Sequence, residues 1–291
     1  RPGRTVTLTI LQRPRKKLDI CDLSFSEAPD VYCLGDDAQR FDPASTDYRT
    51  RMQAILSGIR AVETVGRRRL IERVHFIQFE GAHNAYTFAG RPDIWIYNQI
   101  FWSESAAELR TIAEHESLHL LSDRLGLPEN SPIRELFADL CGYGPFSMQR
   151  FSIMRQGRRR DGSAAAAPGS GLFFDFINEA NFIRGMKGGH AQDDVDEFCA
   201  SFLHTLMYAD RLETLIAMPV LRRDGSVTDL SGKQRQRLLS DYARVLSTVL
   251  TASSAALSVD LSVLLHRAQA TIHRIRSVTD RDGRKTMPAA S

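Results

Sequence analysis

The sequence has few cysteines, no long apolar run and little net charge, and each of these features excludes a class of protein. Its four cysteines include no C-x-x-C pair, so a zinc site built from thiolates is not expected. No apolar run is long enough to cross a bilayer, so no membrane span is expected. A net charge of +3 is too small to indicate a polyanion, and no nucleic acid partner is expected.

The cysteines fall into two kinds. Cys21 and Cys33 flank a short polar segment and would suit a disulfide bond in an exported protein, whereas Cys141 and Cys199 lie on apolar helix faces and are expected to be buried thiols. The sequence begins with Arg1 rather than Met, as expected of a processed, secreted or exported protein or of an excised segment, and it carries no visible targeting signal.

The stretch Ser105–Leu127 is predicted to be one long amphipathic helix. Ser105 and Glu108 have the spacing of a capping box at its start, and Gly126 followed by Pro128 is typical of a helix end. Apolar residues recur between these signals at the spacing of a helix with one face on a core.

This helix carries the motif H-E-x-x-H. His115 and His119 are four residues apart, so both imidazoles project from one face and can bind one metal ion. Glu116 lies about 100° round the helix from His115, where its carboxylate can reach a metal-bound water without itself binding the metal. Two histidines and a neighbouring carboxylate are what a zinc hydrolase requires, so Zn²⁺ is the expected cofactor and Glu116 the expected general base. The alternative is a fortuitous pair of surface histidines.

The rest of the chain predicts a small sheet followed by helices. A strand is expected at Thr5–Leu11, a loop rich in Asp and Pro from there to about Ser45, and a low-complexity loop at Gln156–Gly171. Further strands are expected at Val74–Phe79, Ala85–Phe88 and Asp93–Phe101. Further helices are expected at Tyr48–Val65, after Ser131, after Asp193 or Asp194, and at Lys233–Leu250 and Leu257–Ile275.

These elements predict an α+β fold in which a small mixed sheet backs the metal-binding helix and the C-terminal half is mostly helical. We expect an N-terminal sheet part over residues 1–104, a helical catalytic part over residues 105–276 and a frayed tail over residues 277–291.

A catalytic zinc ion needs a third protein ligand, and one candidate is Glu135. The run from Glu135 to Asp139 resembles the E-x-x-x-D signature of the gluzincin metallopeptidases. The resemblance implies that Glu135 binds zinc and that Asp139 orients a ligand histidine. Glu135 is expected near the start of its helix, however, and its side chain would have to reach several ångströms along the helix axis to the histidines.

The other candidate is Glu197. The stretch His190–Phe202 resembles the third-ligand helix of zincins of the anthrax lethal-factor and Pro-Pro endopeptidase type, in which a ligand Glu is followed by an aromatic residue and, three positions on, by Ala. Phe198 and Ala200 match this pattern. The resemblance implies that Glu197 binds zinc and that His190, in place of the family's Tyr, supports the oxyanion. The alternative is that Glu197 only caps its own helix in a box with Asp194.

The sequence therefore predicts a zincin-like metallopeptidase with zinc bound by His115, His119 and Glu197, and a peptide or protein as substrate. Strand Asp93–Phe101 is expected to bind an extended peptide along its edge. Two other functions remain open, a zinc hydrolase of a non-peptide amide and a binding protein with a structural or vestigial zinc site.

Overall fold

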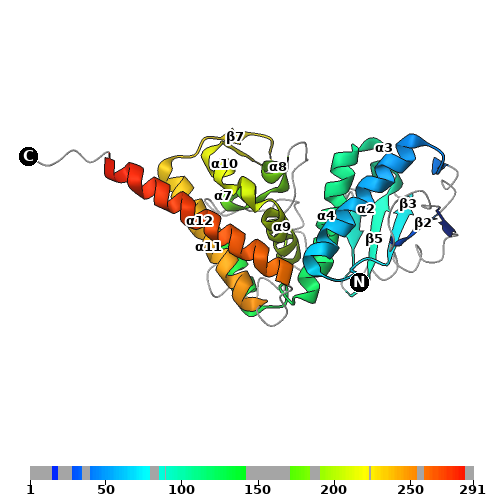
Figure 1. Cartoon of the computed structure of the whole chain (residues 1–291), viewed down its shortest axis with the longest axis horizontal. Coiled ribbons are helices and arrows are strands. Elements are labelled where there is room, and N and C mark those ends of the chain that lie inside the picture. Colours follow the sequence, from blue (N-terminus) through cyan, green and yellow to red (C-terminus); the bar gives the residue numbers. More distant parts are fainter. Residues whose placement is uncertain are drawn as a thin grey trace, which may run out of the picture. The chain divides into compact units, whose positions relative to one another are not determined.

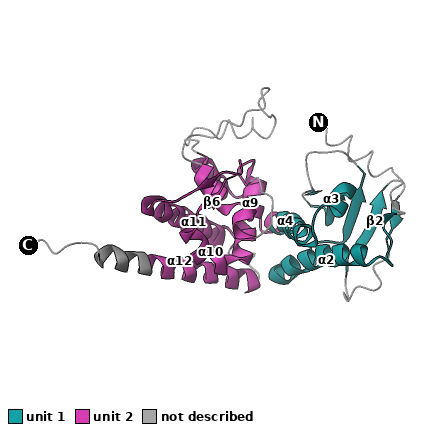
Figure 2. Ribbon diagram, turned by 90° about the horizontal axis from the view of Figure 1, so that it is seen from above, with its two compact units in different colours: residues 1–121 teal, residues 122–291 magenta. Residues whose placement is uncertain are grey.

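The structure of the protein, a computed structural model, describes residues 15–18, 28–34, 40–78, 85–88, 90–141, 171–183, 191–222, 224–253 and 259–285. The chain divides into two compact units, residues 1–121 and 122–291 (Figure 2). The predicted strand Thr5–Leu11 and, except for its last residue, the predicted loop Gln156–Gly171 lie outside the described residues. Cys21 lies outside them as well, so the predicted disulfide with Cys33 stays a prediction. No helix in the described ranges is long and apolar enough to cross a membrane.

Unit 1 contains a five-stranded mixed sheet, and the predicted α+β class is confirmed (Figure 1). Its strands are β1 (Arg15–Lys17), β2 (Asp30–Leu34), β3 (Arg73–Ile77), β4 (Ala85–Thr87) and β5 (Asp93–Tyr97). They are ordered β1-β2-β3-β5-β4, with β2, β3 and β5 parallel and the two outer strands antiparallel to their neighbours. The prediction of a loop up to Ser45 is wrong for β1 and β2.

Strand β5 is shorter than predicted and lies inside the sheet. It ends at Tyr97, and the next residues form the short helix α3 (Asn98–Ser103). Since β5 pairs with β3 on one side and with β4 on the other, the predicted binding of a peptide along its edge is wrong. Among the described strands, β4 is the one at this edge of the sheet.

Helix α2 (Thr46–Gly66) confirms the predicted helix Tyr48–Val65. Ser45 caps its start by accepting a hydrogen bond from the backbone N–H of Tyr48. Its buried face helps to form an aromatic core in which the Phe41 and Phe101 rings each lie against the ring of Phe76. Val74, Phe76, Ile94 and Ile96 are fully buried at alternate positions of β3 and β5, as expected of a sheet face that packs on a core.

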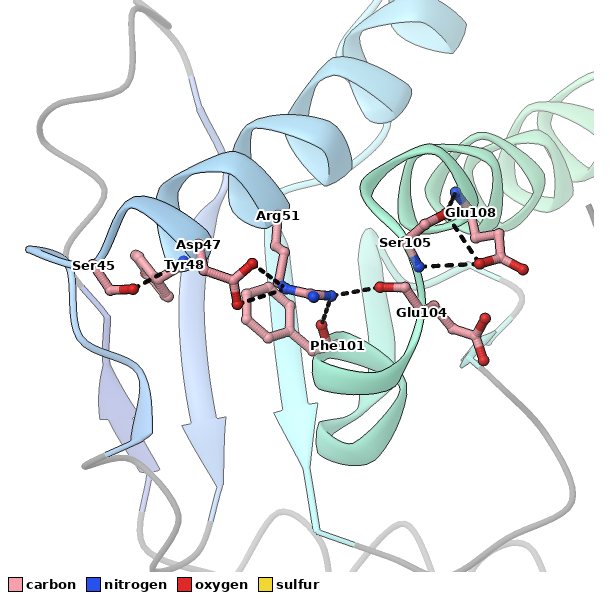
Figure 3. Close-up of polar contacts among 8 residues, drawn as sticks. All are labelled: Ser45, Asp47, Tyr48, Arg51, Phe101, Glu104, Ser105 and Glu108. Atoms are coloured by element: carbon pink, nitrogen blue, oxygen red, sulfur yellow. Dashed lines mark hydrogen bonds and ion pairs between the residues drawn. The ribbon is translucent and has the colours of Figure 1, made fainter. Parts of the chain in front are cut away.

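The start of the H-E-x-x-H helix is held by side chains of two kinds (Figure 3). The predicted capping box is confirmed, since the Glu108 N–H donates to the Ser105 hydroxyl and the Ser105 N–H donates to the Glu108 carboxylate. Arg51 of α2 donates to the carbonyl oxygens of Phe101 and Glu104, at 2.9 and 2.5 Å. These carbonyls lie at the end of α3, where helix geometry leaves them without a partner, so Arg51 ties α2 to the chain entering the next helix.

The helix predicted to bind the metal is α4 (Ala106–Arg124), for which the sequence predicted the bounds Ser105–Leu127. Gly126 follows its end with φ +66°, and the Leu127 N–H donates to the Ser122 carbonyl, as in a glycine-terminated helix. Gly58 of α2 faces α4 closely, because a Cβ atom placed there would lie 2.3 Å from the Arg110 carbonyl oxygen. The absence of a side chain at Gly58 therefore sets how near α2 and α4 approach.

Unit 2 is mainly helical, as predicted for the C-terminal half. Its elements are α5 (Ser131–Leu140), α7 (Gly171–Ile177), α8 (Glu179–Phe182), α9 (Val195–Met207), η3 (Ala209–Arg211), α10 (Leu212–Ala217), β6 (Val220–Leu221), β7 (Val227–Thr228), α11 (Gly232–Ala252) and α12 (Val259–Lys285). Helix α11 packs on α5 and α12, and α9 packs on α5, α7, α8 and α12. Helix α12 continues beyond its predicted end at Ile275 into the predicted frayed tail.

The core of unit 2 is aromatic. The Phe198 ring of α9 contacts the rings of Phe137 and Phe174, and Phe202 contacts Tyr242, whose hydroxyl lies 2.8 Å from the Thr205 hydroxyl. Cys141 and Cys199 are free cysteines, as predicted. Cys199 is buried on α9, whereas Cys141, also predicted to be buried on a helix face, follows the end of α5 and is half-buried. Burial raises the pKa of the Cys141 thiol to about 12 and that of Cys199 well above its ordinary value, so both are thiols at neutral pH.

Candidate metal centre

The two histidines of the H-E-x-x-H motif turn their Nε2 atoms toward one another. Both His115 and His119 are half-buried on α4, their ring centroids are 4.8 Å apart, and their Nε2 atoms are separated by 3.1 Å. At this distance one Nε2–H can donate to the other Nε2, and which nitrogen is the donor depends on the tautomer of each ring. The i, i+4 spacing of the two histidines therefore brings two potential ligand nitrogens close together.

This separation suits one zinc ion. Zn–N bonds of about 2.0–2.1 Å at a tetrahedral angle place two ligand nitrogens about 3.3 Å apart. The observed 3.1 Å is close to that value, so both nitrogens can bind one ion with little movement of the side chains. Imidazole nitrogens also suit other divalent transition metals, but a tetrahedral site with nitrogen and carboxylate ligands is typical of zinc.

Glu116 lies beside this pair and is buried, with 7% of its surface exposed. Burying a charged carboxylate lowers the stability of the fold unless a nearby cation or hydrogen-bond donor compensates its charge. The neighbouring Glu114 is also buried, and its carboxylate accepts a 2.8 Å hydrogen bond from Arg110 one turn earlier. The two buried glutamates of α4 thus differ in their surroundings, since Glu114 accepts a hydrogen bond from an arginine of its own helix and Glu116 lies between the two histidines in the sequence.

Unit 2 carries both candidates for the third ligand. Glu197 is half-buried in the first turn of α9, and Glu135 is exposed on α5. Asp194 caps α9 by accepting hydrogen bonds at 2.9 Å from the backbone N–H groups of Asp196 and Glu197. This half of the capping box uses the Glu197 backbone and not its carboxylate, so capping and metal binding by Glu197 are compatible.

Asp139, predicted to orient a ligand histidine, lies on the surface of unit 2. Its carboxylate is 66% exposed and 2.5 Å from the guanidinium of Arg244 on α11. His190, predicted to support an oxyanion, lies outside the described residues. His75 is buried in β3 between the rings of Tyr32 and Trp95, which agrees with a structural role.

A buried acid–histidine pair in unit 2 was not predicted from the sequence. Glu179, the first residue of α8, has its Oε1 atom 3.8 Å from Nδ1 of His204 on α9, and the two residues are 2% and 1% exposed. The sequence signal was weak, because α8 has only four residues and Glu179 lies in an aromatic stretch that also contains Asp175.

Two groups of described side chains have the composition to hold a metal ion. One group is His115, His119 and Glu197, and the other is His115, Glu179 and His204.

Comparison of the chain with protein-family models, with curated proteins and with solved structures finds no match. The chemistry of the side chains therefore carries the functional argument without support from relatives.

Proposed function

We propose that the protein is a zinc-dependent metallopeptidase of the zincin type. The observation that carries the proposal is the 3.1 Å separation of the His115 and His119 Nε2 atoms on a capped helix that also holds the buried Glu116. Any two histidines four residues apart share a helix face, but here the Nε2 atoms also lie at nearly the distance that two ligands of one zinc ion require.

Zinc would be held by His115, His119 and Glu197. Two nitrogens and one carboxylate oxygen are the ligand set of many catalytic zinc sites, and three protein ligands leave one position open for water or substrate. Glu197 is favoured over Glu135 because it is half-buried whereas Glu135 is exposed, and a ligand carboxylate must leave bulk water. The proposal requires that unit 2 presents Glu197 to the histidine pair of unit 1.

When bound, zinc would lower the pKa of a water molecule and polarise the scissile carbonyl group. Glu116 would accept a proton from that water and then transfer it to the leaving amine. His190 would stabilise the negative charge that develops on the carbonyl oxygen. A substrate peptide in extended form would pair with the edge strand β4, since β5 is covered on both sides.

The experiment that tests this function is digestion of a broad peptide library by the zinc-loaded full chain. We expect cleavage at internal peptide bonds, loss of cleavage when a chelator removes the metal and recovery when zinc is restored, with fragments identified by mass spectrometry. A chain that binds zinc tightly and cleaves no peptide would contradict the peptidase proposal and support a binding protein with a structural or vestigial site.

A further inference from the structure

Aromatic side chains gather on one face of the sheet in unit 1, at the edge formed by β4. This edge cluster consists of Tyr86, Phe88, Trp95 and Tyr97. Tyr86 is paired with Trp95 in the register of β4 and β5, and their rings are parallel to within 5° with centroids 6.2 Å apart. The Phe88 ring lies 5.2 Å from the Tyr86 ring, and the Tyr97 ring lies 6.0 Å from it. Since side chains alternate along a strand, the edge cluster lies on the face opposite to the residues of β5 that pack on the core.

The edge cluster is buried on its inner side and partly exposed on its outer side. Trp95 and Tyr97 of β5 are 1% and 6% exposed, whereas Tyr86 and Phe88 at the edge are half-buried. The indole N–H of Trp95 is buried and has no hydrogen-bond partner among the described residues. Because a buried indole N–H usually has an acceptor, the edge cluster lacks a polar group that a bound molecule can bring.

The two edges of the described sheet differ in charge. Strand β1, at one edge, consists of the three basic residues Arg15, Lys16 and Lys17. Charged residues on an edge strand discourage pairing with another chain. Strand β4, at the other edge, consists of Ala85, Tyr86 and Thr87 and carries no charge. An uncharged edge beside half-buried aromatic rings favours the addition of a strand, so β4 is the edge suited to pair with a peptide.

We propose that the edge cluster determines the specificity of the proposed peptidase by binding an aromatic or large aliphatic side chain of an extended substrate that pairs with β4. A strand added there places one residue opposite Tyr86 on the same face, with Cβ atoms about 4.5–5.5 Å apart. Aromatic cross-strand pairs are favourable, and a small or charged side chain gains little at this position. Because the substrate class is assigned, this inference rests on the proposed function, and every residue of the edge cluster belongs to unit 1.

Equilibrium binding of two fluorescent decapeptides to the full chain tests the edge cluster separately from cleavage. In one peptide Phe alternates with Thr and Lys, and in the other Ser replaces each Phe. The alternation places every Phe side chain on one face of the extended peptide. Fluorescence anisotropy measures binding to the zinc-free chain. We expect the Phe peptide to bind about 2–10-fold more tightly than the Ser peptide, the effect of one aromatic pair.

Substitution Tyr86→Thr should abolish this preference, because threonine favours strands but lacks the ring. The matched control is Tyr32→Thr. Tyr32 is also half-buried on a strand of this sheet, but it lies next to β1, and its ring stacks on that of His75 at 5.6 Å. The control should keep the preference for the Phe peptide. If Tyr86→Thr does not fold, Phe88→Ser, at the position after β4, tests the same cluster.

The outcomes separate this inference from the proposed function. Equal binding of the two peptides to the parent chain overturns the inference, as does a preference that survives Tyr86→Thr, and the proposed function then stands. Loss of the preference in Tyr32→Thr as well would also overturn it, since the effect would then come from a general disturbance of the sheet. If the preference depends on Tyr86 while the zinc-loaded chain cleaves no peptide, the proposed function fails and the edge cluster remains a peptide-binding site.

Discussion

Substitution Glu116→Gln is expected to lower kcat about 10²–10⁴-fold, the usual contribution of a general base, while zinc remains bound. Glutamine keeps the size of the side chain and its place on α4, but it cannot accept the proton of the attacking water. Since Glu116 is not a proposed ligand, zinc affinity should stay within a few-fold of the parent. Peptide cleavage under saturating substrate and chelator competition for zinc measure the two quantities separately.

Glu114→Gln is the matched control for this prediction. Glu114 is the other buried glutamate of α4, it is fully buried, and its carboxylate accepts a hydrogen bond from Arg110. We expect Glu114→Gln to reduce the free energy of unfolding, because a buried charged contact is weakened, and to leave kcat near that of the parent. Equal losses of kcat in the two variants would contradict a chemical role for Glu116 and indicate a general disturbance of the helix.

The second large effect, a loss in the free energy of unfolding, is expected for the substitution Gly58→Ala. The new methyl group would lie 2.3 Å from the Arg110 carbonyl oxygen and 3.2 Å from the Ala113 Cβ, so the backbones of α2 and α4 must separate. Alanine is favoured over glycine within a helix by about 1 kcal/mol, which partly offsets the cost of overpacking. We expect a net loss of at least about 1–2 kcal/mol in the free energy of unfolding, measured with urea.

Gly66→Ala is the matched control, because it adds the same methyl group to α2 at a position that faces side chains and not a backbone carbonyl. A methyl group at Gly66, on the same helix, would meet the ends of two leucine side chains, Leu121 at 3.2 Å and Leu70 at 4.0 Å, and a leucine side chain can shift where a backbone carbonyl cannot. The free energy of unfolding should therefore change by less than about 1 kcal/mol. An equal loss in both variants would contradict the view that Gly58 sets the distance between α2 and α4.

The parts of the fold that the sequence predicted well are those with local signals. Helix α4 was predicted because Ser105 and Glu108, three residues apart, mark its start and Gly126 marks its end, and the structure shows the capping box and the positive φ of Gly126. The convergence of His115 and His119 follows from helix geometry alone, since side chains four residues apart share a face.

The features that the sequence could not predict depend on distant parts of the chain. The stretch Asp93–Phe101 is apolar on both faces, which does not distinguish a buried strand from a short helix, and the chain turns into α3 at Asn98. Strand β2 was missed because its register is set by β3, about forty residues later in the chain. The proximity of Glu179 to His204 depends on the packing of α8 on α9, which no spacing encodes.

The central claim is that one zinc ion is bound by His115, His119 and Glu197. The most direct test is zinc stoichiometry and affinity, measured on the purified full chain and on Glu197→Ala and Glu135→Ala by elemental analysis and chelator competition. We predict one zinc per parent chain, loss of tight binding in Glu197→Ala and retention in Glu135→Ala. If Glu135→Ala loses tight zinc binding and Glu197→Ala keeps it, the third ligand is Glu135 and not Glu197. A parent chain that binds no zinc would contradict the account as a whole.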